Sequence, residues 1–311
     1  MTVCIAVLFN WNYAPAGQPP QYGRGAITAS DRMITAADVQ YEPQQQKIAF
    51  FGKSLVLVAG DIGIHSQAIR DTEKEIRGRD LSPHDIAQIY GRALQAISRR
   101  QAENEILAPL GLNTDTFHAQ QKEFSSGFVE MITSQLQHRR PIESEALVVG
   151  SNGESAQIYS IDAYGNETCL DGVGFGAIGI GAWHAKSRLM QIGHTSTRFM
   201  AQALASIFAA KKNAEIAPGV GSNTDMHFIL KDAVFPIWDS VAPELVRLYQ
   251  KYSAETSKFG DSMIQELNEF ISKPPRSSEA SASEVPLDGA FGKGAHADGD
   301  EISSAAQSPI I

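Results

Sequence analysis

The first part of the chain contains four segments of strand-like composition with no helical segment between them. These segments are rich in β-branched and apolar residues, and turn or loop signals such as "APAGQPP" and "FGKS" separate them. They cover residues 2–10, 25–31, 47–51 and 54–59. A chain that begins in this way is not built from alternating βαβ units.

Helices and strands follow in blocks. Helical spacing begins after "AGD" and leads into "SPHDIAQIYGRALQAIS", which starts with a Ser-Pro helix signal. Further helices are predicted over about 125–136, 182–193 and 195–212, and in the segments "APELVRLYQKYSAETSKF" and "MIQELNEFIS". Strands are predicted in "EALVVG", "SAQIYSID", "TDMHFILKD" and "VFPIWDS". This order predicts an α+β fold: a four-layer αββα sandwich of two antiparallel sheets between helical layers.

The composition changes near the C-terminal end. Residues 273–311 are rich in Ser, Ala, Gly, Pro and acidic residues, which leaves few groups to bury. We therefore expect one folded domain over residues 1–272 and a disordered, low-complexity tail over 273–311.

Charge and cysteine content restrict the classes of partner. The net charge of −9 argues against nucleic-acid binding, which requires clustered Lys and Arg. No run approaches the ~18 apolar residues of a membrane span, and the start lacks the basic segment of a secretory signal. Cys4 and Cys169 have no partner at metal-ligand or redox spacing, so we expect both to be buried apolar residues. These features predict a cytoplasmic protein.

A small set of residues in the strand-rich start suggests chemistry. Asp31 ends one strand segment, Lys47 follows sixteen positions later, and Gly60 ends the block. If Met1 is removed, Thr2 offers its hydroxyl as a nucleophile and its own α-amine as the base. The unperturbed pKa of such an amine is about 7.7–8.0, and a nearby lysine ammonium lowers it. The alternative is a surface ion pair and a turn glycine.

The chain resembles the proteasome β-type family of N-terminal nucleophile hydrolases, which includes bacterial proteasome-like proteins that begin at the nucleophile. The resemblance rests on Thr2 in "MTVCIAV", on "ASDRMIT", and on the spacing from Asp31 to Lys47 with its "KI". It also rests on "VLVAGD", "IYSID", "AIGIGAWHA" and "TDMHFIL", and it covers most of residues 2–232.

The resemblance implies the N-terminal nucleophile (Ntn) hydrolase fold and a threonine-type amide-bond hydrolase that acts on peptides or unfolded protein. It implies that Thr2, Asp31 and Lys47 are catalytic, that Thr35 holds the substrate backbone, that Gly60 supplies the oxyanion-hole N–H, and that Met33, Ala49 and Ile62 line the substrate pocket. It further implies a ring-like homo-oligomer. No metal or cofactor is expected, because the histidines lack zinc-ligand spacing; His65, His184 and His227 are expected to be structural or surface residues.

Two departures from the family pattern support a second hypothesis. Ile180 replaces the serine of a Gly-Ser-Gly turn, and "APGVGSNTD" stands where the family has Asp-x-x-Ser-Gly. Ser222, Glu215 and Asp225 are the candidates that could substitute. The alternative function is a catalytically decayed assembly or binding protein.

A third hypothesis is nucleotide binding. Gly174, Gly176 and Gly179 match the G-x-G-x-x-G spacing of dinucleotide-binding loops. Such a loop opens a βαβ unit and has an acidic residue about 20 positions later. Because the region near Thr197 has no acidic residue, a close-packed strand-to-helix turn is the favoured interpretation.

Overall fold

The computed structural model describes residues 2–13, 21–36, 39–42, 47–231, 233–237 and 241–272. The chain divides into two units, residues 1–255 and 256–311. The expected tail of residues 273–311 lies outside the described residues.

Two five-stranded antiparallel sheets form the centre of the first unit. The first sheet has the order β10 (Phe175–Ile178), β1 (Cys4–Tyr13), β2 (Gln21–Asp31), β11 (Thr224–Leu230) and β12 (Ala233–Pro236). The second has the order β5 (Ile48–Phe51), β6 (Ser54–Gly60), β7 (Ser144–Ser151), β8 (Ala156–Ile161) and β9 (Glu167–Cys169). A separate hairpin joins β3 (Ile34–Ala36) to β4 (Val39–Tyr41).

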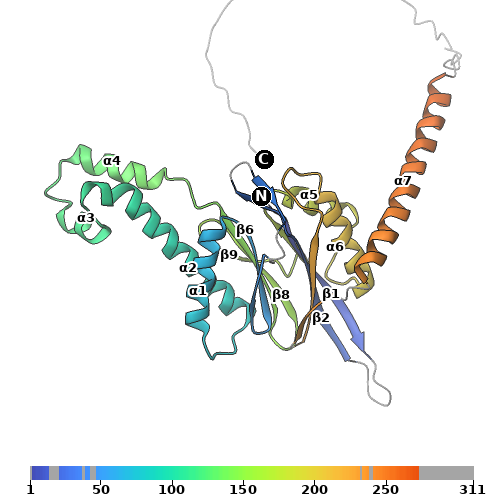
Figure 1. Cartoon of the computed structure of the whole chain (residues 1–311), viewed down its shortest axis with the longest axis horizontal. Helices are drawn as coiled ribbons and strands as arrows, with labels where there is room; N and C mark the ends of the chain where they lie inside the picture. The colour runs from blue at the N-terminus through green and yellow to red at the C-terminus, as the bar shows by residue number, and fades with distance from the viewer. Residues whose placement is uncertain are drawn as a thin grey trace, which may run out of the picture. The chain divides into compact units, whose positions relative to one another are not determined.

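Helices α1 (Ile62–Ile76) and α2 (Pro83–Ala102) cover the outer face of the second sheet, and α5 (Ala182–Gln191) and α6 (Met200–Ala214) cover that of the first. The other described helices are α3 (Thr114–Gln120), α4 (Ser126–Gln137) and α7 (Val241–Ser272). Short π and 3₁₀ turns at Glu103–Leu107 and Ala108–Leu110 follow α2. Figure 1 shows α1 and α2 on one side of the sheets and α5 and α6 on the other.

The alternation of side chains along β1 and the residue before it explains this layering, because successive side chains of a strand point to opposite faces. Val3, Ile5 and Val7 pack in one cluster with residues of α5 and α6. Cys4, Ala6 and Leu8 pack in a second cluster with β6, β7 and β8 of the other sheet. A third cluster lies between the second sheet and helices α1 and α2. The predicted α+β class with two antiparallel sheets is confirmed.

Helix caps explain where two helices begin. Ser82 caps α2 and forms a capping box with Asp85, as the Ser-Pro signal predicts. The side chain of Asp61 accepts hydrogen bonds from the N–H groups of Gly63 and Ile64 and so caps α1 directly after β6. The Asp61 cap therefore fixes the position at which β6 ends and α1 begins.

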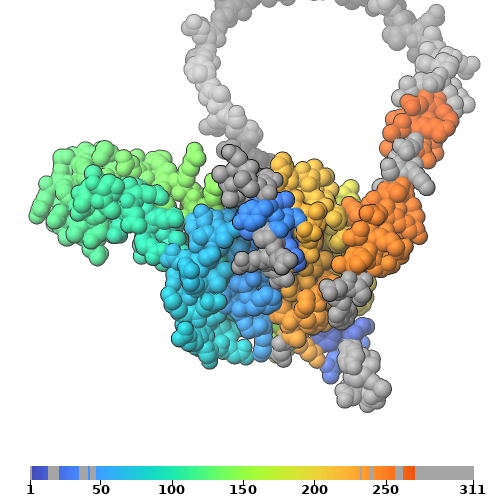
Figure 2. All heavy atoms as spheres, in the orientation of Figure 1, coloured from blue at the N-terminus to red at the C-terminus, as the bar shows by residue number. Residues whose placement is uncertain are grey.

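The region around α3 and α4 has a small core of its own. Leu107, Phe117 and Ile132 form this cluster. Figure 2 shows the two helices as a green lobe beside α1 and α2. The segment between α2 and α4 therefore contains the short helix α3 and contributes to this small core.

Two features differ from the sequence interpretation. The hairpin of β3 and β4 was not expected, since three-residue strands give little periodic signal. Cys4 is buried as expected, but Cys169 is exposed. The reason is that Cys169 ends β9, an edge strand that is exposed along its length.

Among the described helices, none is both long and apolar enough to cross a bilayer.

Candidate active site

Thr2 lies two residues before the first residue of β1, and it is 3% exposed. Its hydroxyl donates a hydrogen bond to Oδ1 of Asp31. The ammonium of Lys47 donates to Thr2 Oγ1 at 2.5 Å and to Asp31 Oδ1 at 3.1 Å. The three residues named from the sequence as catalytic are therefore in direct contact.

The pairing of β1 with β2 brings Asp31 to the start of the chain. The register places Cys4 opposite Ser30, and the N–H of Asp31 donates to the carbonyl of Val3 at 3.2 Å. In return the N–H of Val3 donates to Asp31 Oδ1 at 2.9 Å. This exchange fixes the Asp31 carboxylate beside Thr2.

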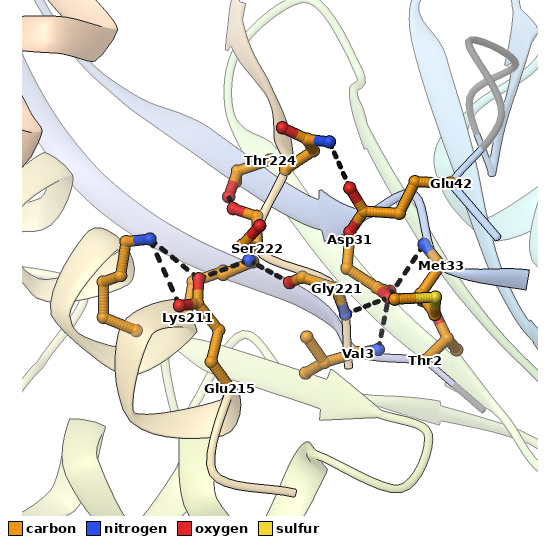
Figure 3. Close-up of polar contacts among 12 residues, drawn as sticks. Thr2, Val3, Asp31, Met33, Glu42, Lys211, Glu215, Gly221, Ser222 and Thr224 are labelled. Carbon is orange, nitrogen blue, oxygen red and sulfur yellow. Dashed lines mark hydrogen bonds and ion pairs between the residues drawn. The ribbon is translucent and has the colours of Figure 1, made fainter. Parts of the chain in front are cut away.

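Three backbone N–H groups hold the Asp31 carboxylate, which is fully buried. Besides Val3, Met33 donates to Oδ2 at 3.1 Å and Gly221 donates to Oδ2 at 3.0 Å. Figure 3 shows these donors converging on Asp31 from different segments. A buried carboxylate with this many partners has its hydrogen-bonding capacity satisfied and has little freedom to move.

Lys47 reaches the site from the other sheet. It directly precedes β5, and its carbonyl accepts a hydrogen bond from the N–H of Val58 in β6 at 3.2 Å. Its side chain is nearly buried. The contact between Lys47 and Thr2 therefore depends on the packing of the two sheets against each other.

A cavity of about 340 Å³ opens at Thr2. Thr2, Lys47 and Gly60 lie on its wall, together with the apolar side chains of Met33, Tyr41 and Ile62. Two of the three predicted pocket residues, Met33 and Ile62, thus line the cavity. Ala49 does not appear on this wall and instead packs against the cluster beneath α1 and α2.

Gly60 lies at the edge of the cavity, and its backbone has a φ of +116°, a conformation that residues with a side chain rarely adopt. A Cβ on Gly60 would lie 1.9 Å from the carbonyl oxygen of Glu143. The backbone therefore requires glycine here. Thr35 lies in β3, but its side chain is outside the part of the chain that the structure describes.

His65 is a cavity residue that the sequence did not single out as functional. It is buried on α1, and its Nε2 lies 2.9 Å from the carbonyl of Ala59. Its Nδ1 lies 2.8 Å from the hydroxyl of Tyr90. Burial lowers the pKa of His65. Because Nε2 faces a carbonyl oxygen, it donates, and in a neutral ring Nδ1 then accepts from the Tyr90 hydroxyl, so both ring nitrogens have partners within the fold.

Three residues were candidates to substitute where the chain departs from the pattern of the resembling family, and each of them contacts residues other than Thr2, Asp31 and Lys47. Glu215 accepts hydrogen bonds from Lys211 and Lys212. Asp225 forms an ion pair with Arg32. The carbonyl of Ser222 accepts from the hydroxyl of Thr224, and its side chain is exposed. From the segment "APGVGSNTD", the backbone N–H of Gly221 contacts Asp31 in the candidate site. A motif of side chains could not reveal a backbone contact of this kind.

The glycine-rich segment does not form the loop of a dinucleotide site. Gly176 lies within β10, which pairs antiparallel with β1. Gly179 follows β10 with a φ of +85°, and a Cβ there would lie 2.4 Å from the carbonyl oxygen of Thr2. The N–H of Gly181 donates to the same oxygen at 3.3 Å. These glycines allow the close approach of a strand-to-helix turn to Thr2.

The chain was compared with models of known protein families and with curated proteins, and neither comparison finds a match. The assignment of a function therefore depends on the geometry around Thr2. That geometry brings the Thr2 hydroxyl and the Lys47 ammonium together beside the cavity that both residues line, with the buried Asp31 carboxylate in contact with both groups.

Proposed function

We propose that this protein is a threonine-type amide-bond hydrolase with Thr2 as its nucleophile. The observation that carries the proposal is the position of Thr2, which lines the cavity and whose hydroxyl contacts both Asp31 and Lys47. An alcohol oxygen next to an ammonium is electrostatically favoured as it becomes anionic during attack. The resemblance to the proteasome β-type family and the two antiparallel sheets support the same proposal, with the Ntn-hydrolase fold as the framework.

The base in this proposal is the α-amine of Thr2, which exists only after the residues before Thr2 are removed. An α-amine has an ordinary pKa of about 8, so a useful fraction is neutral near physiological pH. The amine takes the hydroxyl proton while Oγ1 attacks the substrate carbonyl, and it then returns the proton to the leaving amine. Water hydrolyses the resulting ester in the reverse sense, which releases the acyl group and restores Thr2.

The neighbours of Thr2 have separate roles. Lys47 donates to Oγ1 and repels a second positive charge, which favours the neutral amine. Asp31 orients Lys47 and the Thr2 hydroxyl through contacts with both. In the proposal the N–H of Gly60, at the cavity edge, stabilises the oxyanion.

The cavity favours one class of substrate. Met33, Tyr41 and Ile62 give it an apolar wall next to the nucleophile. A peptide whose side chain before the scissile bond is apolar would bury that side chain there. Peptides or unfolded protein segments with such residues are the substrates that we propose.

One observation favours a second candidate, a non-catalytic assembly or binding protein. Ile180 lies between the two glycines that contact the Thr2 carbonyl, and its apolar side chain is 48% exposed. The resembling family has a serine hydroxyl at this position. A chain that lost catalysis would tolerate such a replacement.

Two measurements on the purified chain separate the candidates. Intact mass shows whether the chain begins at Thr2, because any residue retained before it converts the amine into an amide with no basicity. A β-lactone or epoxyketone probe followed by peptide mapping should then modify the peptide that contains Thr2, and Thr2→Ala should not be modified. A chain that begins at Thr2 but does not react with the probe and hydrolyses no peptide would favour the non-catalytic candidate.

A further inference from the structure

A lysine is buried on the side of the site away from the cavity. Lys211 belongs to α6, and its side chain is 0% exposed. Its ammonium donates to the carbonyl of Gly221 at 2.6 Å and to Glu215 Oε1 at 2.6 Å. Burial lowers the pKa of Lys211, and the hydrogen bond to Glu215 opposes this effect. Burying an ammonium costs free energy unless it is paired, so the buried position of Lys211 indicates a specific structural role.

The backbone of Gly221 connects Lys211 to the candidate site. The carbonyl of Gly221 points to Lys211, whereas its N–H points to Asp31 Oδ2 at 3.0 Å. Figure 3 shows the two contacts on either side of the Gly221 backbone. A Cβ on Gly221 would lie 1.9 Å from Glu42 Oε1, so a larger residue here would require the Glu42 side chain to move.

The contacts form one continuous path from α6 to the hydroxyl of Thr2. Glu215 and Gly221 hold Lys211, Gly221 holds one oxygen of Asp31, and the other oxygen of Asp31 holds Thr2.

We propose that Lys211, supported by Glu215, is a positioning residue: it fixes the Gly221 backbone so that the Gly221 N–H orients Asp31 against Thr2 and Lys47. This inference rests on the proposed function. Lys211 does not contact the reacting groups, because the Gly221 backbone and the Asp31 carboxylate lie between its ammonium and the Thr2 hydroxyl.

The neighbouring lysine provides a matched control. Lys212 also contacts Glu215, at 2.9 Å, and its ammonium lies 5.7 Å from the centre of the Phe208 ring. The Lys212 ammonium donates hydrogen bonds to both carboxylate oxygens of Glu215, whereas the Gly221 carbonyl accepts from Lys211. Lys212→Met therefore removes a cation from the same helix and the same carboxylate, but leaves the path to Asp31 in place.

The test compares Lys211→Met, Lys211→Gln and Lys212→Met in steady-state hydrolysis of a fluorogenic peptide. Lys211→Met removes the donor and should lower kcat about tenfold to a hundredfold, because a small misplacement of reacting groups has an effect of that size. KM should stay within about twofold, since the cavity wall is untouched. Lys211→Gln retains an N–H donor and should recover part of kcat, and Lys212→Met should match the wild type.

The outcomes separate this inference from the proposed function. If Thr2→Ala is inactive but Lys211→Met keeps the wild-type kcat, the positioning role is wrong and the proposed function stands. If Thr2→Ala retains full activity, the proposed function fails and this inference fails with it. Equal losses of kcat in Lys211→Met and Lys212→Met would also overturn the positioning role. Should Lys211→Met not fold, Glu215→Gln replaces it: a fall in kcat at constant KM supports the role, and an unchanged kcat contradicts it.

Discussion

The ammonium of Lys47 lies 2.5 Å from the hydroxyl oxygen of Thr2, although the two residues are 45 positions apart. Thr2 precedes β1 of one sheet, and Lys47 precedes β5 of the other. The contact therefore depends on how the two sheets pack, and it brings a cation to the hydroxyl of a residue that lines the cavity.

Replacing Thr2 tests the nucleophile. Thr2→Ala should abolish hydrolysis of a fluorogenic peptide, because no other group on Thr2 can form the acyl-enzyme. The loss of its hydrogen bonds to Asp31 and from Lys47 should reduce the free energy of unfolding by about 1.5–3 kcal/mol, because both partners are charged. Thr2→Ser keeps both the amine and the hydroxyl and should retain part of the activity. Wild-type turnover in Thr2→Ala would end the threonine-nucleophile hypothesis.

Replacing Lys47 tests whether the site acts as a unit. Lys47→Ala should lower activity nearly as far as Thr2→Ala. The double variant with both substitutions should be no less active than either single variant, because residues that act together do not contribute additively. It should also lower the free energy of unfolding by about 3 kcal/mol, since buried Asp31 loses its cation. Lys53→Ala is the matched control, because Lys53 pairs with Asp80 at the surface and should change both quantities little.

A methyl group on Gly60 should disturb the cavity edge. Gly60→Ala forces an unfavourable φ and a collision with the Glu143 carbonyl, so we expect a loss of activity and a melting temperature several degrees lower. Gly52 is the control: its φ is +60°, and a Cβ there would meet nothing within 4 Å. Gly52→Ala should therefore destabilise the fold by only about 1 kcal/mol and leave kcat/KM unchanged. Similar kinetics for the two variants would argue against a special role for Gly60.

A charge on the cavity wall should change the preferred substrate. The wild type should prefer an apolar side chain before the scissile bond, and Ile62→Lys should shift this preference toward acidic side chains. Ile216→Lys adds the same charge at a residue that is exposed and is not part of the cavity wall, and it should leave the preference as it is. A peptide library read by mass spectrometry measures both profiles. A wild-type preference for charged residues would contradict the apolar-wall assignment.

His65 should make the fold less stable in acid. Burial lowers the pKa of His65 in the folded chain, whereas in the unfolded chain it should be near 6.5. Below about pH 6.5 the unfolded chain therefore binds a proton that the folded chain does not, and the free energy of unfolding falls by up to about 1.4 kcal/mol per pH unit until the folded pKa is reached. Denaturant unfolding at pH 7.5 and pH 5.5 measures the fall.

Two variants isolate the contribution of His65 from that of other groups. His65→Gln has no imidazole to protonate and should show a smaller fall between the two pH values. His118→Gln changes an exposed histidine and should show the same fall as the wild type. A fall of equal size in all three proteins would mean that His65 does not contribute.

Much of the fold could be predicted from local patterns. The strands around Cys4, Ile48 and Ser54 and the helix that begins after Ser82 were expected within a few residues of their observed limits. Alternation and capping signals act between near neighbours, so a sequence displays them directly. Cys169 was expected to be buried and is exposed, because burial depends on whether a strand lies at the edge of its sheet.

For the candidate site, the sequence by itself determined which groups are available: a hydroxyl at Thr2, a carboxylate at Asp31, an ammonium at Lys47 and glycine at Gly60. Only the tertiary structure decided which groups meet. Asp31 receives the Gly221 N–H from 190 positions away, and Ala49 packs beneath the helices instead of lining the cavity. Such contacts depend on strand register and on the packing of one sheet on the other, and these arise from interactions summed over the whole core, which no local pattern encodes.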